Sequence, residues 1–120
     1  MERSAFVDRL TQRIHIADGA MGTQLHELGA AWDGSFENMN RTAPEHVFEI
    51  HRRYVAVGAD ILETNTFQAN RMSLALKGLE AYVEDINTAG VRLAREAAGP
   101  DTLVAGSIGP VSAKAVEDEL

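Results

Sequence analysis

Three short segments carry small and polar residues in an arrangement suited to binding a ligand. They are Asp-Gly-Ala-Met-Gly-Thr from residue 18, Glu-Thr-Asn-Thr-Phe-Gln-Ala-Asn from residue 63 and Ser-Ile-Gly-Pro from residue 107. Carboxylates such as Asp18 attract cationic groups, and glycines let backbone N–H groups approach a ligand closely. A small-molecule site built from these segments is the first functional hypothesis.

The first segment also has a purely structural interpretation. An Asp-Gly pair after a strand is most often just a turn, because glycine supplies the backbone freedom that tight turns need. The segment matches neither the dinucleotide-binding nor the P-loop glycine pattern. It contains no basic residue to meet a phosphate, so a phosphate site is not predicted.

The second segment favours a site more strongly. Glu63 falls inside a predicted buried strand, where an ionised carboxylate is costly unless it is paired. By strand alternation Asn65 shares the side of Glu63, whereas Thr64 and Thr66 point the other way.

Histidine and cysteine offer no metal site. His46 and His51 are five residues apart and do not share a helix face as an i, i+4 metal-binding pair would, so solvated surface positions are expected. The absence of cysteine excludes disulfides and thiolate ligands within the chain. Trp32, in a loop, is either a lid over a pocket or a local packing anchor.

Each of the three segments follows a predicted strand. The strands are Ile14–Ala17, Asp60–Thr64 and Leu103–Ser107, and the sequence between them has helical periodicity. The expected order is a parallel βαβαβ unit of the α/β class. Such a unit belongs either to an open doubly wound sheet or to an eight-stranded barrel, and both bind ligands at the carboxyl ends of their strands.

Capping residues and glycines mark the expected helices. The first helix is expected to start at Ser4, and the second to span Thr23–Leu28 before Gly29. The third starts at a capping box, Thr42–Glu45 with Thr42 as N-cap, and stops at Gly58. A helical segment from Arg71 is broken at Gly78, and the last helix runs through Val83 and Ala97 and stops at Gly99. Residues 30–41 are expected to form an irregular connection. The charged residues Glu84, Asp85, Arg92, Arg95 and Glu96 are expected on the solvated face of the last helix.

Composition narrows the functional class. The 120 residues suit one globular domain, with 45% hydrophobic and 24% charged residues. A net charge of -7 argues against a nucleic-acid partner. No apolar run approaches the roughly 20 residues of a membrane span, and no signal peptide is recognisable, so we expect a cytoplasmic protein without a membrane partner.

Taken together, ADGAMGTQL, GADILETNTF and GSIGP resemble the homocysteine S-methyltransferase family. The resemblance covers roughly residues 12 to 110. The intervening segments FENMN, ANRMSLALKGLEAYV and INTAGVRLAREAAG look most like bacterial enzymes that join this domain to a methylenetetrahydrofolate reductase. The homocysteine domain of cobalamin-dependent methionine synthases is the second most similar group.

The resemblance implies a (β/α)8 TIM barrel, of which residues 1–120 would be the N-terminal portion with the first three strands. In this family, zinc held by three cysteines activates the thiol of homocysteine, which takes a methyl group from a folate, a corrinoid (cobalamin) or an onium donor to give methionine. Those cysteines lie on later strands, so the chain alone is expected to be inactive.

The resemblance also implies roles for six residues. Asp18 would face the ammonium group of homocysteine, and the backbone N–H groups near Gly19 and Ala20 would meet its carboxylate. Glu63, Asn65 and Thr66 would line the same pocket. No catalytic residue and no metal ligand is predicted in this chain.

Two alternatives remain open at this stage. The chain could belong to a different α/β-barrel enzyme, or it could be a non-catalytic fragment that assembles through open strand edges. A truncated barrel leaves such edges unpaired, and unpaired edges favour self-association.

Overall fold

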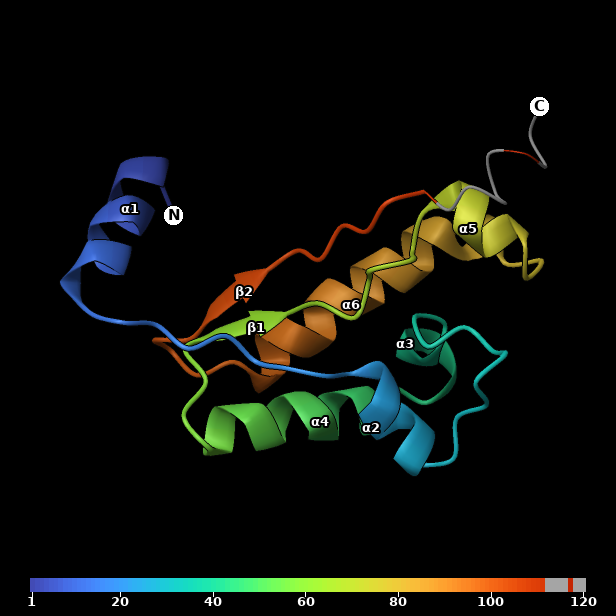
Figure 1. Ribbon diagram of the computed structural model, residues 1–120, viewed down its shortest axis with the longest axis horizontal. Helices are drawn as coiled ribbons and strands as arrows, with labels where there is room; N and C mark the ends of the chain where they lie inside the picture. The colour runs from blue at the N-terminus through green and yellow to red at the C-terminus, as the bar shows by residue number, and fades with distance from the viewer. Residues whose placement is uncertain (112–116, 118–120) are drawn as a thin grey trace.

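The computed structural model describes residues 1–111 and 117. Figure 1 shows their arrangement, in which short parallel strands lie against helices. The elements in chain order are α1 (Arg3–Gln12), α2 (Gly22–Glu27), α3 (Met39–Thr42), α4 (Pro44–Ala56), β1 (Ile61–Glu63), α5 (Arg71–Ala75), the 3-10 helix η1 (Glu80–Tyr82), α6 (Val83–Ala97) and β2 (Leu103–Ala105). None of the described helices is both long and apolar enough to cross a membrane.

The strands are parallel, which confirms the predicted α/β class. Ile61 of β1 pairs with Leu103 of β2, and on its other side Ile61 forms a parallel bridge with Ala17. The prediction of a full first strand over Ile14–Ala17 is wrong, because only Ala17 forms a bridge. Ile14 and Ile16 are 86% and 62% exposed. Their side chains therefore lack the packing within the described chain that would hold the segment along β1 as a strand.

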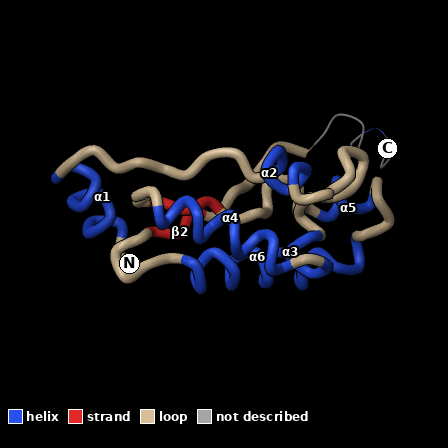
Figure 2. Tube along the Cα trace, turned by 90° about the horizontal axis from the view of Figure 1, so that it is seen from below, coloured by secondary structure: helices blue, strands red, loops and turns tan. Residues whose placement is uncertain are grey.

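Helices cover one side of the paired strands. Figures 1 and 2 show α4 and α6 side by side and next to β1 and β2, whereas α1 stands apart from the strands. The main core cluster joins Leu25 of α2, Val47 and Ile50 of α4, and Leu93 of α6, all almost fully buried. A smaller cluster of Ala69, Leu74 and Ile86 lies under α5.

Glycines end three of the helical segments as predicted. Gly29, Gly58 and Gly78 adopt φ values of 107°, 100° and 68°, a region that costs residues with a Cβ atom about 1 kcal/mol or more. The charged residues predicted for the outer face of α6 are all exposed, which confirms that face.

The predicted capping box is wrong. Thr42 is the last residue of α3, a short helix inside the expected irregular connection, and Ala43 is the N-cap of α4 without a side-chain hydrogen bond. The hydroxyl of Thr42 instead donates to the carbonyl of Asn38 at 3.3 Å. Ser4 is likewise not a cap, because α1 begins at Arg3.

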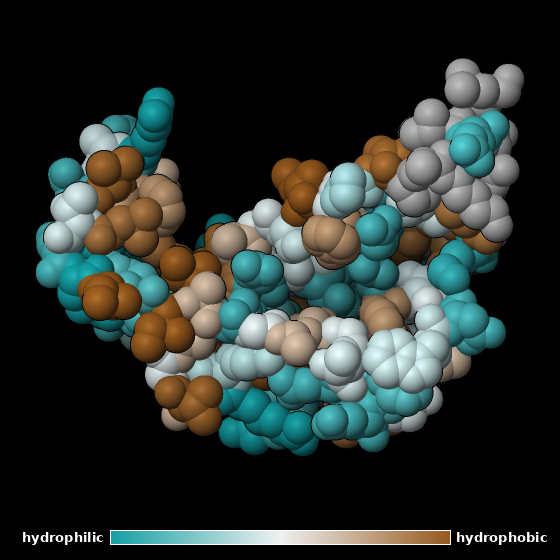
Figure 3. Space-filling model, viewed as in Figure 1, coloured by the Kyte–Doolittle hydropathy of each residue, from teal (hydrophilic) through white to brown (hydrophobic). Residues whose placement is uncertain are grey.

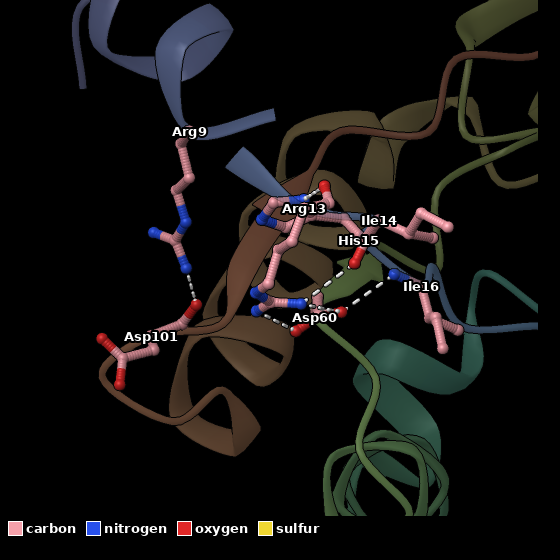
Figure 4. Close-up of polar contacts among 7 residues, drawn as sticks. All are labelled: Arg9, Arg13, Ile14, His15, Ile16, Asp60 and Asp101. Carbon is pink, nitrogen blue, oxygen red and sulfur yellow. Dashed lines mark hydrogen bonds and ion pairs between the residues drawn. The ribbon is translucent and has the colours of Figure 1, made fainter. Parts of the chain in front are cut away.

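Helix α1 is attached to the rest of the molecule by polar contacts. It has no buried residue, and Figures 1 and 3 show it standing apart across an open notch. In Figure 4 the Arg13 guanidinium, just after α1, binds the Asp60 carboxylate at 2.7 Å, and Arg9 donates to the Asp101 carbonyl. The hydrogen bond from Arg13 holds the pKa of Asp60 well below its usual range.

The expected surface position of His51 is also wrong. The side chain is fully buried, because it follows Val47 by one helical turn and shares the core-facing side of α4. Neither ring nitrogen has a hydrogen-bond partner among residues 1–111 and 117. Burial lowers the pKa of His51 to about 4. His46, in contrast, is only partly buried.

His51 should make the fold sensitive to acid. Its pKa falls from the ordinary value of 6.5 to about 4 in the folded protein, so the unfolded chain takes up a proton first. The free energy of unfolding should therefore fall as the pH drops from about 6.5 to about 4, by at most roughly 3 kcal/mol. Urea unfolding of the complete domain at pH 7 and pH 4.5 measures this loss, and His51→Leu should reduce it. His15→Gln controls for the loss of one histidine; equal acid sensitivity in all three proteins would contradict the prediction.

The isolated chain should self-associate. Ile14, Ile16 and Ile108 are 86%, 62% and 93% exposed, and within the described chain β2 and the segment at Ala17 each leave one strand edge unpaired. Light scattering at micromolar concentration should show oligomers or aggregates. A monodisperse 13.0 kDa monomer with a sharp cooperative melt would overturn this expectation.

Candidate functional site

A cavity lies where the strands end. It has a volume of about 530 Å³, and its walls come from the loops after Ala17, β1 and β2, together with residues 32–37. Of the six predicted site residues, Asp18, Gly19, Glu63, Asn65 and Thr66 line this cavity. Ala20 is not among its lining residues. The topology thus brings together loops that are 45 residues apart in the chain, as the parallel strand order requires.

Asp18 is held by the end of β1. Its Oδ2 accepts a hydrogen bond from the backbone N–H of Glu63 at 3.0 Å. Its Oδ1 is buried and has no partner among the described residues. Burial raises the pKa of Asp18 to about 6, and the negative charge of Glu63 acts in the same direction. Asp18 lines the cavity and keeps one buried carboxylate oxygen without a partner among the described residues, which suits it to bind a cationic group.

Glu63 reaches the site for a different reason than expected. Its side chain is exposed, so the argument that a buried strand carboxylate needs a partner does not apply. β1 ends at this residue, and Glu63 lines the cavity with an exposed carboxylate.

The loop after Asp18 presents backbone donors. The N–H groups of Gly19 and Ala20 make no hydrogen bond within residues 1–111, so they remain available to an anionic group. The Ala20 carbonyl, in contrast, is occupied: it accepts from the Tyr54 hydroxyl at 2.7 Å and from the Gln24 amide at 3.2 Å. Within the described residues, the Ala20 carbonyl is thus occupied, whereas the N–H groups of Gly19 and Ala20 are not.

Asn65 is part of a buried amide network. Its Nδ2 donates to the Phe36 carbonyl and to Oδ1 of Asn40, both at 2.9 Å. Asn40 in turn donates to the carbonyls of Asn65 and Ile86 at 2.8 and 3.0 Å. The amide of Asn65 therefore joins the loop after β1 to the segment before α3, and both donor hydrogens of Nδ2 are used within the protein.

Thr66 joins the loop after β1 to the loop after β2. Its hydroxyl lies 2.6 Å from that of Thr64, which confirms that these two side chains share a side. Thr66 donates to the Ser107 carbonyl at 2.8 Å, and the Ser107 N–H donates to Thr64 Oγ1 at 3.0 Å. These hydroxyls close the floor of the cavity by holding two strand ends together.

Glu37 and Asn40 belong to the site although the sequence did not predict them there. Glu37 is buried, lines the cavity and accepts from the Gln68 N–H at 3.0 Å. Both residues belong to the FENMN segment, whose two asparagines and one acid in a predicted loop were the available signal. Because their partners lie 25 or more residues away, the sequence alone does not reveal the pairing.

Trp32 forms part of the cavity wall and also packs locally. Its ring stacks on His26 with ring centroids 4.0 Å apart and lies edge-to-face with Phe36, with ring centroids 5.8 Å apart.

Within residues 1–111 and 117, no group of three or more His, Cys, Asp or Glu side chains is placed to hold a metal ion.

The chain belongs to the homocysteine S-methyltransferase family. Residues 15–119 match this family. The chain is 38% identical over 116 residues to the methionine synthases of Mycobacterium leprae and Mycobacterium tuberculosis. In each case the match covers 87% of this chain and 10% of the relative, so the chain spans about a tenth of those proteins. Methionine synthases are the second of the two groups that the motifs resemble.

Solved structures of the homocysteine methyltransferase MmuM from Escherichia coli have the same fold in the matched region. The metallated form superposes with a TM-score of 0.76 at 29% identity, over 92% of this chain and 43% of that one. The oxidized form gives a TM-score of 0.72 at 33% identity, over 84% of this chain and 39% of that one. The chain therefore spans less than half of a homocysteine methyltransferase.

Removing the charge of Asp18 should stabilise the fold near neutral pH. The pKa of this carboxyl is raised from 3.8 to about 6, so the folded state holds its proton more tightly than the unfolded state does. Stability is then lost as the pH rises from about 4 to about 6. After allowance for solvent screening, Asp18→Asn should raise the free energy of unfolding at pH 7 by about 1 kcal/mol, with no gain below pH 4.

Denaturant unfolding of the complete domain at pH 7 and pH 3.5 measures this difference. Asp33→Asn, at an exposed position of the loop before α3, controls for the loss of one negative charge. An Asp18→Asn protein that is less stable than the wild type at pH 7 would mean that the ionised carboxylate supports the fold.

Proposed function

We propose that this chain is the N-terminal portion of a homocysteine S-methyltransferase domain and supplies the loops that bind the amino-acid end of homocysteine. The complete domain would transfer a methyl group to the homocysteine sulfur and release methionine. Membership of the family and the likeness to MmuM support this proposal. The domain would be a (β/α)8 barrel, in which the segment at Ala17, β1 and β2 stand for the first three strands.

One observation carries the proposal. The unpaired Oδ1 of Asp18 lies in the same loop as the free N–H groups of Gly19 and Ala20. An α-amino acid carries an ammonium and a carboxylate on one carbon atom, and it needs an acceptor and donors in close proximity. Asp18 would bind the ammonium and the two N–H groups the carboxylate. Glu63 would add to the negative potential around the ammonium, and Asn65 and Thr66 would hold the surrounding loops in place.

The zinc ion that the family resemblance implies does not fit the residues of this chain. The chain has no cysteine, and its described His, Asp and Glu side chains form no group of three. Zinc ligands would therefore come from outside these 120 residues, and the isolated chain should not catalyse the reaction. A folate or cobalamin compound is the proposed methyl donor.

Titration of the complete domain with homocysteine tests the role of Asp18. A charge-assisted hydrogen bond contributes about 1.5–3 kcal/mol, so Asp18→Asn should weaken homocysteine binding by about 10- to 150-fold. A homocysteine analogue without the amino group should bind the wild type and Asp18→Asn equally. Asp33→Asn should keep wild-type affinity for both ligands.

Two results would contradict the proposal at different levels. Equal homocysteine affinity in the wild type and Asp18→Asn would remove the role given to this carboxylate. A complete domain that neither binds homocysteine nor forms methionine from a folate or cobalamin methyl donor would refute the function itself.

A further inference from the structure

Tyr54 contacts the Asp18 loop from a distant part of the chain. It lies on α4, 34 residues after Ala20, and its ring packs on the main core cluster. The hydroxyl donates to the Ala20 carbonyl at 2.7 Å and accepts from Gln24 Nε2 at 2.7 Å. Tyr54 does not line the cavity, so it acts on a ligand only through the loop.

The loop is shaped to fit this hydroxyl. A Cβ atom at residue 19 would lie 3.1 Å from Tyr54 Oη, which is closer than ordinary packing allows. The same Cβ would lie 3.7 Å from Cε1 and Cζ of the ring, which is an ordinary contact. A Cβ atom at position 19 would therefore crowd the hydroxyl group and not the ring.

The hydroxyl remains a donor under ordinary conditions. Burial raises the pKa of Tyr54, and the nearby charge of Asp18 acts in the same direction. With Gln24 donating to the hydroxyl oxygen, its single proton points to the Ala20 carbonyl. The peptide unit that follows Ala20 is thereby held against α4.

From this geometry we infer that Tyr54 is a positioning residue, whose hydroxyl holds the loop of residues 18–20 in the shape that binds the amino-acid group. The inference rests on the proposed function for its ligand, but the contact itself is independent of the ligand. Because the loop binds the unreactive end of homocysteine, Tyr54 affects the ground state and the transition state equally. Its loss should raise KM for homocysteine and leave kcat unchanged.

The test compares Tyr54→Phe with Tyr82→Phe in the complete domain. Both variants lose one hydroxyl, and that of Tyr82 makes no hydrogen bond within the described residues, although its ring contacts Arg41. Tyr54→Phe should raise the Kd and KM for homocysteine by about 2- to 10-fold, whereas Tyr82→Phe should not change them. A lower kcat with an unchanged KM would overturn the inference.

A double-mutant cycle adds a second criterion. Gly19→Ala should weaken homocysteine binding on its own, because the new methyl group meets the Tyr54 hydroxyl. In the Tyr54→Phe background the same substitution should cost less, since the oxygen is gone. Additive effects of the two substitutions would show that the hydroxyl does not set the loop, and would overturn the inference.

Hydrogen exchange separates failure of this inference from failure of the proposed function. The Asp18 amide donates to the Ile61 carbonyl, and the Glu63 amide donates to Asp18 Oδ2. The hydrogen exchange of these two amides in the ligand-free domain therefore reports on the loop. Tyr54→Phe should speed their exchange by about 2- to 10-fold, and Tyr82→Phe should not. If the wild type binds no homocysteine, the proposed function is wrong, and this exchange still decides whether Tyr54 holds the loop. Unchanged exchange in Tyr54→Phe would overturn the inference.

Discussion

The parallel pairing around Asp60 and Ile61 is the constraint on which the rest of this structure depends. The backbone of Asp60 and Ile61 binds the Ile16 carbonyl on one side, at 2.7 and 3.2 Å, and the Asp60 carbonyl accepts from the Leu103 N–H on the other, at 2.9 Å. The Asp60 carboxylate adds bonds to the Ile16 N–H and to Arg13. Since parallel strands end at the same edge, this pairing brings together the loops that begin at residues 18, 64 and 106.

At this edge of the sheet, most polar side chains of the loops have hydrogen-bond partners within the protein, and one oxygen of Asp18 does not. Side-chain hydrogen bonds from Asn40, Asn65 and Thr66 join the loops to one another and to α6. Asp18, in contrast, keeps one buried oxygen without a partner in the described chain, and an unsatisfied buried polar group costs about 1–3 kcal/mol. A stability cost of this kind is typical of binding sites, where the ligand supplies the missing partner.

The glycines of the loop after Ala17 lie where other parts of the chain approach it closely. Gly19 allows the Tyr54 hydroxyl to approach from α4, and Gly22 allows the Phe36 ring to approach from the segment before α3, where a Cβ atom would lie 3.1 Å from the ring carbons. Neither glycine has a positive φ, so both favour close approach of a neighbour and not an unusual turn. The loop is thus a place where three distant parts of the chain are in contact, and this explains why small residues are concentrated there.

The sequence by itself determined the α/β class, the parallel order, the glycine ends of helices and the family, because these depend on local periodicity, on backbone conformation and on short motifs. It also predicted Asp18 as a site residue, and the structure places Asp18 in the wall of the cavity. Only the tertiary structure decided that Thr42 ends a helix and does not cap one, that Ile14–Ala17 contributes a single bridge, and that His51 is buried while Glu63 is exposed. These properties depend on which distant side chains pack against each residue. The pairing of Asn40 with Asn65, or of Tyr54 with Ala20, has no local signal, because each bond joins segments that come together only after the strands have paired.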